Sequence, residues 1–238
     1  MEFIYADTLK EIFDVEGHFY DLRIGREVFK CRSSLEIVSK QKGNSSAEAV
    51  DAVIIMMNPG SSVPRDKNYS PILLSLDDIF SRNWEKEIIP TRPDNAQYQI
   101  MRLMILNDWK RVKILNLSDL RNGNSGEFCK EFERAGVIDS SNPHCITHES
   151  RRAELNNSLQ TKSNGFVLAA WGTVDVLKNS ALKMIAYQPT LLGIKLNDPW
   201  YKYASPYKKE QKLEWLMKMD AIVKMNSSGA NGYTQVRA

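Results

Sequence analysis

The segment VDAVIIMMNPGSS, Val50 to Ser62, decides the fold. An apolar run of strand type ends abruptly at Asn58-Pro59-Gly60, which predicts a buried strand followed by a tight turn. Pro59 would hold the turn rigid and Gly60 would leave open space, so that the Asn58 amide is aimed into a crevice or at a bound water. A turn selected only for its own conformation is the alternative interpretation.

Short apolar strands alternate with helical patterns from this segment onward. Strands are expected at 52–57, 111–117, 165–171 and 190–196, and helical patterns at 95–109, 126–136, 149–160, 173–186 and 207–225. Alternation of this kind is typical of crossover units on a parallel sheet. We therefore expect an α/β fold, a three-layer α/β/α sandwich with a central, mainly parallel four-stranded sheet.

The region before residue 50 has a different pattern. A short helical pattern, ADTLKEIF, precedes the alternating segments FYDLRIG and EVFKCRSSLEIV, which predict a hairpin. We expect residues 1–49 to form a cap on the main domain, residues 50–225 to form that domain, and the polar residues 226–238 to be a flexible tail.

The composition is that of a globular protein: 238 residues, of which 42% are apolar and 9% aromatic. Lys and Arg exceed Asp and Glu by only 32 to 29, which permits a polyanionic partner without requiring one. No apolar run approaches the roughly 20 residues that span a bilayer, and the N-terminal segment MEFIYADTLKEIF is too acidic for a signal peptide. We therefore expect a cytoplasmic protein without a membrane partner.

The three cysteines, Cys31, Cys129 and Cys145, are far apart or unpaired in sequence, which suits reduced thiols. In NPHCITH, His144, Cys145 and His148 are close enough in sequence to share a metal ion, with Cys129 as a fourth ligand. The spacing matches no standard zinc module, so a polar surface loop is the simpler interpretation. We expect no metal and no cofactor.

Two later strands also end in chemically distinctive residues. Asn116 follows VKIL, and its amide both donates and accepts, which suits paired hydrogen bonds to a nucleobase edge. The run GFVLAA leads into Trp171-Gly172-Thr173, where Thr173 is a natural N-cap and the first turn of the next helix would offer an anion site. A capped helix without a ligand is the alternative there. Open α/β sheets bind ligands at the carboxyl ends of their strands, so these residues should gather at one edge.

The segment NDPWYKYASPYKKEQK, Asn197 to Lys212, precedes the last predicted helix. It combines aromatic residues and prolines with four lysines, which suits stacking on bases and neutralising phosphates. A solvated loop with incidental aromatic residues is the alternative.

Taken in order, these segments resemble the motifs of the uracil-DNA glycosylase superfamily, most closely its mismatch-specific and thymine-DNA glycosylase branch. The matching segments lie within about residues 50–215 and read MMNPGSS, ILN, WGT and YASPYK. The resemblance implies a uracil-DNA glycosylase-like fold and a monofunctional DNA glycosylase. Such an enzyme would hydrolyse the N-glycosidic bond of a flipped base through an oxocarbenium-like transition state, as a monomer, on single- or double-stranded DNA with a modified or mismatched base.

Carried over by position, the resemblance gives Asn58 the role of orienting the attacking water. Asn116 would bind the base edge, while Pro59 and Gly60 would border the base. Tyr69 is the candidate for the aromatic residue on which the flipped base stacks.

The resemblance also implies contacts with DNA. Gly172 and Thr173 would grip a phosphate. The loop of Ser205, Pro206 and Tyr207 would press on the duplex and fill the vacated stack, and the lysines around it, Lys208 among them, would bind DNA.

The chain departs from the family's pattern at four positions. Asn58 stands where uracil-specific members have an acid, and it cannot remove a proton, so we expect slow turnover. Tyr203 stands at the place of the catalytic His, and Tyr207 replaces the Leu wedge. Gly60 replaces the aromatic residue that bars pyrimidines with a substituent at C5.

The absence of that aromatic wall at Gly60 favours a 5-substituted or otherwise modified pyrimidine as the substrate. Heavily modified cytosines are best known from phage genomes, so defence against phage with modified DNA is a hypothesis that follows.

Three other interpretations stay open. A glycosylase-like module could bind modified DNA or a nucleotide without cleaving it, because the acid and the His are missing. NDPWY is similar to the Asp-Pro-Pro-Tyr motif of DNA amino-methyltransferases, but MMNPGSSVP supplies only one glycine for their cofactor loop. An uncharacterised bacterial family with Asn-Pro-Ser in the first motif is also similar to parts of the chain.

Overall fold

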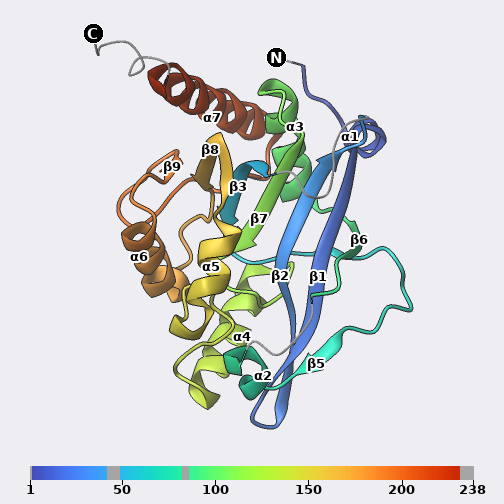
Figure 1. The fold of residues 1–238 in the computed structure, drawn as a ribbon, viewed down its shortest axis with the longest axis vertical. Coiled ribbons are helices and arrows are strands. Elements are labelled where there is room, and N and C mark those ends of the chain that lie inside the picture. The colour runs from blue at the N-terminus through green and yellow to red at the C-terminus, as the bar shows by residue number, and fades with distance from the viewer. Residues whose placement is uncertain (1, 42–48, 82–85, 231–238) are drawn as a thin grey trace.

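The computed structural model describes residues 2–41, 49–81 and 86–230 (Figure 1). This part of the chain is an α/β protein with one mixed sheet of nine strands and seven α-helices. The strands are β1 (Phe13–Ile24), β2 (Glu27–Ser39), β3 (Val50–Met56), β4 (Val63–Pro64), β5 (Ile72–Leu74), β6 (Ile89–Arg92), β7 (Arg111–Asn116), β8 (Thr161–Ala169) and β9 (Leu192–Gly193). The helices are α1 (Ala6–Ile12), α2 (Leu76–Ser81), α3 (Asn95–Leu106), α4 (Ser125–Ile138), α5 (Arg152–Ser158), α6 (Lys178–Tyr187) and α7 (Lys209–Ala230).

The strand order is β4-β6-β1-β2-β7-β3-β8-β9, and β5 pairs with β1. β7, β3, β8 and β9 pair in parallel, as the alternating sequence pattern predicts. The first expected strand is confirmed as β3, and the last, expected at 190–196, is reduced to the two residues of β9. The remaining pairs extend the sheet on the β7 side, mostly in antiparallel orientation.

β3 is apolar because both of its faces are covered. Val53 and Ile55 belong to one hydrophobic cluster, while Ala52, Ile54 and Met56 belong to another. The first cluster includes side chains of α2, α4, α5 and α6, and the second includes side chains of α1, α3 and α7. A strand packed on both faces needs a continuous apolar run rather than an alternating one, and this is the pattern that VDAVIIMM has.

β1 and β2 form the predicted hairpin, with register from Phe13↔Ser39 to Ile24↔Glu27. Figure 1 shows β2 and then β1 to the right of β7, with α5 and α6 to the left of β7. β2 pairs antiparallel with β7, so residues expected to form a cap are strands of the same sheet as β3. β2 contributes Phe29 and Cys31 to one hydrophobic cluster and Leu35 and Ile37 to the other, which determines the surroundings of the site described below.

The C-terminal boundary also differs from the prediction. α7 continues to Ala230, so residues 226–230 extend a helix instead of starting the expected tail, and residues 231–238 lie outside the described part. Among the helices that the structure describes, none has both the length and the apolar character needed to cross a membrane.

Candidate functional site

The structure brings the two predicted asparagines to the same edge of the sheet. β3 and β7 are neighbouring parallel strands, and Met56 is in register with Asn116. Asn58 follows the end of β3 by two residues and is 8% exposed, while Asn116 ends β7 and is fully buried. Pro59 is buried beside Asn58. The predicted convergence of strand ends is therefore present for these two amides.

The amide nitrogen of Asn58 binds the loop that follows β7. Nδ2 donates to the backbone oxygen of Asn122 at 2.8 Å and of Leu120 at 3.3 Å. These bonds fix the plane of the amide and leave Oδ1 as the atom that can accept a hydrogen bond from a bound water. The side chain is thus positioned by protein and not by solvent.

Asn116 contacts a residue that the sequence analysis did not single out, Arg32 of β2. Arg32 is 1% exposed, and its Nη2 donates to Asn116 Oδ1 at 3.1 Å. Within the described residues, no hydrogen-bond acceptor is in reach of Arg32 Nε, Arg32 Nη1 or Asn116 Nδ2. Burial lowers the pKa of Arg32 to about 10, so the guanidinium is still charged at neutral pH. Three buried donors without acceptors are costly, so an acceptor that bound there, from a water or from a ligand, would relieve that cost.

Asp94 links this pair to the first motif. It is the N-cap of α3, where its Oδ1 accepts from Ala96 and Gln97 in a capping box. Its negative charge raises the pKa of Arg32, against the larger effect of burial, and contributes to raising that of Tyr203. The charge of Asp94 therefore acts both on Arg32 and on Tyr203 of the final motif.

Gly60 has a backbone reason to be glycine. Its φ is +65°, and a Cβ atom built on it would lie 2.5 Å from Asp94 Oδ2. Any side chain there would be strained and would collide with the cap of α3. Asp94 thus fills the space where a side chain of residue 60 would begin. The expected role of Gly60 in admitting a substituent stays a prediction that rests on the resemblance alone.

The third strand end and the final motif also meet. The backbone N–H of Gly172 donates to the oxygen of Tyr201 at 3.0 Å, and a Cβ at Gly172, whose φ is +78°, would lie 3.5 Å from the Cβ of Tyr203. Tyr203 is 38% exposed. Loss of water around the phenol, and secondly the charge of Asp94, raise its pKa to about 12. At neutral pH Tyr203 is therefore a neutral hydrogen-bond donor.

The expectation for Thr173 was wrong. Thr173 is exposed and caps no helix, because the next turn is a short 3-10 turn, Asp175–Leu177, whose N-cap is Val174. α6 begins only at Lys178, and its N-cap position has no side-chain hydrogen bond. The strand leaves the sheet through an extended segment, so the first-turn N–H groups expected to bind a phosphate are not placed at Thr173.

The loop before α7 is partly as predicted. Ser205 and Pro206 are half-buried, whereas Tyr207 is 98% exposed and Lys208 is also exposed. Two of the other lysines of the segment are engaged: Lys202 pairs with Glu214 at 3.0 Å, and Lys209 donates to the hydroxyl of Tyr5. Lys212, in the first turn of α7, is half-buried. The loop thus presents an aromatic tip but few free charges.

Tyr69 is not placed with the asparagines. Its hydroxyl donates to Glu87 at 3.2 Å, and its ring lines a cavity that neither Asn58 nor Asn116 lines. The structure therefore places Tyr69 in a different cavity from the asparagines, and its stacking on a flipped base stays a prediction.

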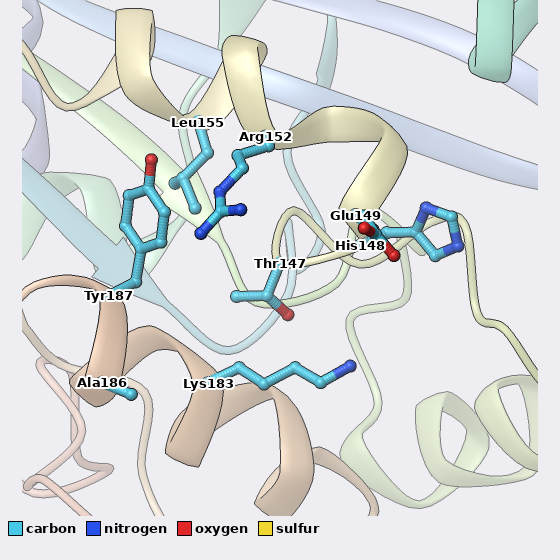
Figure 2. Close-up of a pocket in the computed structure, with 8 residues that line it drawn as sticks. All are labelled: Thr147, His148, Glu149, Arg152, Leu155, Lys183, Ala186 and Tyr187. Carbon is cyan, nitrogen blue, oxygen red and sulfur yellow. The ribbon is translucent and has the colours of Figure 1, made fainter.

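A different cavity, of about 410 Å³, lies between α5 and α6. Figure 2 shows Arg152 and Leu155 reaching toward it from α5, Tyr187 and Lys183 on α6 across from them, Thr147 between the two helices and the His148 ring turned away. None of the residues predicted for the site lines it. The cavity is thus separate from the strand-end residues.

The NPHCITH segment is part of the core. His144 and Cys145 are buried, and His148 is the N-cap of a 3-10 turn, with Nδ1 accepting from the N–H of Ser150. Burial raises the pKa of the Cys145 thiol to about 12, so it is not a thiolate. In the part of the chain that the structure describes, no group of three His, Cys, Asp or Glu residues could hold a metal ion.

Comparison with protein-family models, with curated proteins and with solved structures finds no match for this chain. The site must therefore be interpreted from its own geometry.

Proposed function

We propose that this protein is a monofunctional DNA glycosylase that hydrolyses the N-glycosidic bond of a flipped, 5-substituted pyrimidine. In this proposal β7, β3, β8 and β9 form the four-stranded parallel sheet of a three-layer glycosylase core, which the hairpin extends. The parallel pairings and the helices of both hydrophobic clusters support it.

The observation that carries the proposal is the group of three buried donors without acceptors on Arg32 and Asn116. A pyrimidine edge offers carbonyl oxygens and a ring nitrogen to such donors. The base departs with negative charge, and a guanidinium in a buried site stabilises that charge more strongly than it would in water. Arg32 would thereby replace the imidazole that is missing at Tyr203.

The remaining residues have supporting roles in this proposal. Asn58, with Nδ2 tied to the backbone, would orient water through Oδ1 without removing its proton, and Tyr203 would donate a hydrogen bond as a neutral phenol. Tyr207, 98% exposed, would enter the stack that the flipped nucleotide leaves. Because Asn116 is fully buried, the surrounding side chains must rearrange when a base binds.

The test is a set of DNAs that carry different modified pyrimidines, incubated with the protein in single-turnover conditions and then treated with hot alkali to reveal abasic sites. We expect cleavage at one class of modified base. Asn116→Ala should weaken recognition of that base by about 1–3 kcal/mol, the range for a lost bidentate contact. Asn58→Ala should abolish excision while DNA binding persists.

Stability must be measured alongside, because Asn58 also holds backbone oxygens. If every DNA stays alkali-stable, or if Asn58→Ala excises as fast as the wild type, the catalytic proposal is wrong.

A second candidate, a non-catalytic module that binds modified DNA or a nucleotide, is favoured by one observation: no carboxylate stands in place of Asn58 to activate water. The same assay distinguishes the two, since the module would bind the modified DNA and leave no abasic site. The methyltransferase interpretation gains no support, because Trp200 and Tyr201 of NDPWY are buried in the core.

A further inference from the structure

Two neighbouring cavities lie between the tip half of the hairpin and the first motif. One, of about 430 Å³, is lined by residues 28–30, 60–63 and 121–123 together with two residues of α4. The other, of about 410 Å³, extends along residues 63–71 and includes Arg92. They share Lys30, Val63 and Arg121. We call their union, from Gly60 to Tyr69, the hairpin groove.

The hairpin groove contains basic side chains that form no close ion pair. Lys30, Lys67, Arg92 and Arg121 line it, and no carboxylate of the described residues lies within 4.0 Å of their charged groups. A fifth basic residue, Arg134, pairs with Glu27 at 2.6 Å. The acidic residues that line the groove are Asp21, Asp66 and Glu131. Asp21 is the cross-strand partner of Lys30, and its charge interacts with those of Lys30 and Arg121. The five basic side chains still outnumber the three acidic ones, and an excess of cations spread along one groove favours a polyanion over a single small anion.

The groove is connected to the strand-end site through the backbone. Arg121 Nη1 donates to the oxygen of Ser62 at 3.4 Å and thereby ties the loop after β7 to the loop after β3. The same loop after β7 receives both hydrogen bonds from Asn58, at Leu120 and Asn122. A strand lying in the groove would therefore run directly past the residues that are proposed to act on the base.

We propose that the hairpin groove binds the sugar-phosphate backbone of the DNA strand that carries the target base, with Lys30, Lys67 and Arg121 neutralising successive phosphates. This inference rests on the proposed function for the identity of the polymer. It places the DNA on the hairpin, which the sequence motifs do not include, instead of on the lysine loop. Tyr69, at the far end of the groove, offers a ring face for a neighbouring base.

The test uses the full chain and a short fluorescent DNA without any modified base, so that binding is measured independently of excision. Lys30→Gln combined with Lys67→Gln changes two exposed side chains and should leave folding intact. The logarithmic dependence of affinity on salt should become shallower by about 1.5, because two fewer counter-ions are released, and affinity at 0.1 M salt should fall about 30-fold. Arg121→Gln should add to this loss.

The matched control is Lys178→Gln combined with Lys183→Gln, which removes the same charge from two exposed side chains of α6 and should leave the salt dependence unchanged. If Lys208→Gln combined with Lys209→Gln shifts the slope and the groove variant does not, DNA lies on the loop before α7 and the inference is wrong. Lack of any DNA binding by the wild type also overturns it. Loss of excision on every modified DNA with an unchanged groove effect would instead overturn only the proposed chemistry.

Discussion

Two buried arginines, Arg32 on β2 and Arg151 in the η1 turn (Glu149–Arg151), differ in how many of their nitrogens have hydrogen-bond partners. Arg32 is 1% exposed and has one hydrogen bond, to Asn116, with two of its nitrogens left without an acceptor among the described residues. Arg151 is 2% exposed, and all three of its nitrogens have partners. Burial disfavours the charge of both, yet the pKa of Arg32 falls to about 10 while that of Arg151 is raised.

The partners of Arg151 explain its raised pKa. Nη1 lies 2.8 Å from Asp119 Oδ2, and Nε and Nη2 contact both carboxylate oxygens of Glu154 at 2.8 and 3.0 Å. Tyr20 donates to the same Asp119 oxygen at 2.7 Å, which ties the turn to β1. The attraction of two carboxylates outweighs the cost of burial.

The comparison shows that a buried charge can serve structure or a ligand, and that its hydrogen bonds tell which. Every nitrogen of Arg151 has a partner and the residue holds elements together, although Asp119 Oδ1 has no hydrogen-bond partner among the described residues. Arg32 carries the cost of burial without the compensating acceptors, so its stabilisation would come from a molecule that binds.

The largest expected effect is in the paired network. Arg151→Met leaves Asp119 buried without its cation, so the free energy of unfolding should fall by about 3–5 kcal/mol. Urea unfolding followed by circular dichroism measures this. A loss below 1 kcal/mol would remove the contrast with Arg32, since it would mean that the Arg151 network contributes little.

The pH dependence of stability sharpens the same contrast. Burial disfavours the charge of Glu154, but Arg151 and Lys86 outweigh it and lower its pKa to about 2, from an ordinary value of 4.5. Because the pKa of Glu154 is lower in the folded state, its contribution to the free energy of unfolding is fully present above about pH 4.5 and is lost as the pH falls toward 2. The loss should reach about 3 kcal/mol.

The control for this effect is Glu154→Gln, which lacks the titrating group. The difference in unfolding free energy between wild type and Glu154→Gln should shrink as the pH falls from 5 to 2.5. A difference that stays constant over this range would contradict the assignment of the shift to Glu154.

Sequence pattern alone predicted the hairpin, β3 and the parallel pairing around it, because burial on both faces leaves a continuous apolar run. It placed Asn58 and Asn116 at one edge correctly, since neighbouring parallel strands end together. It failed at Thr173, where a capping residue type precedes an extended segment instead of a helix. Local capping preference is a weak signal when the chain must first leave the sheet.

Arg32 was missed for a topological reason. The alternating pattern of β2 suits a hairpin with one solvated face, and an arginine on such a strand is expected to lie in solvent without a specific role. The pairing of β2 with β7 brings Arg32 to Asn116, and packing in both hydrophobic clusters covers the two faces of β2. Asp94 did leave a signal, the sequence DNAQ of a capping box before an apolar helix, but its contact with Gly60 depends on the fold.

The smallest expected change in stability tests the central claim about Arg32. Arg32→Met removes two buried donors that have no acceptor, at the cost of the bond to Asn116, so the free energy of unfolding should stay the same or rise by about 1 kcal/mol. Excision should nevertheless be lost if Arg32 stabilises the departing base.

Arg102→Met is the matched control. Arg102 is also buried with a pKa of about 10, but its Nε and Nη1 donate to Ile4 and Gln99. We expect Arg102→Met to reduce stability by about 1–3 kcal/mol and to leave excision by the folded protein unchanged. Arg32→Lys keeps the charge without the planar fork and should retain part of the excision rate. If Arg32→Met instead unfolds the protein as readily as Arg151→Met does, then both arginines serve structure, and the three free donors lose their meaning as a ligand site.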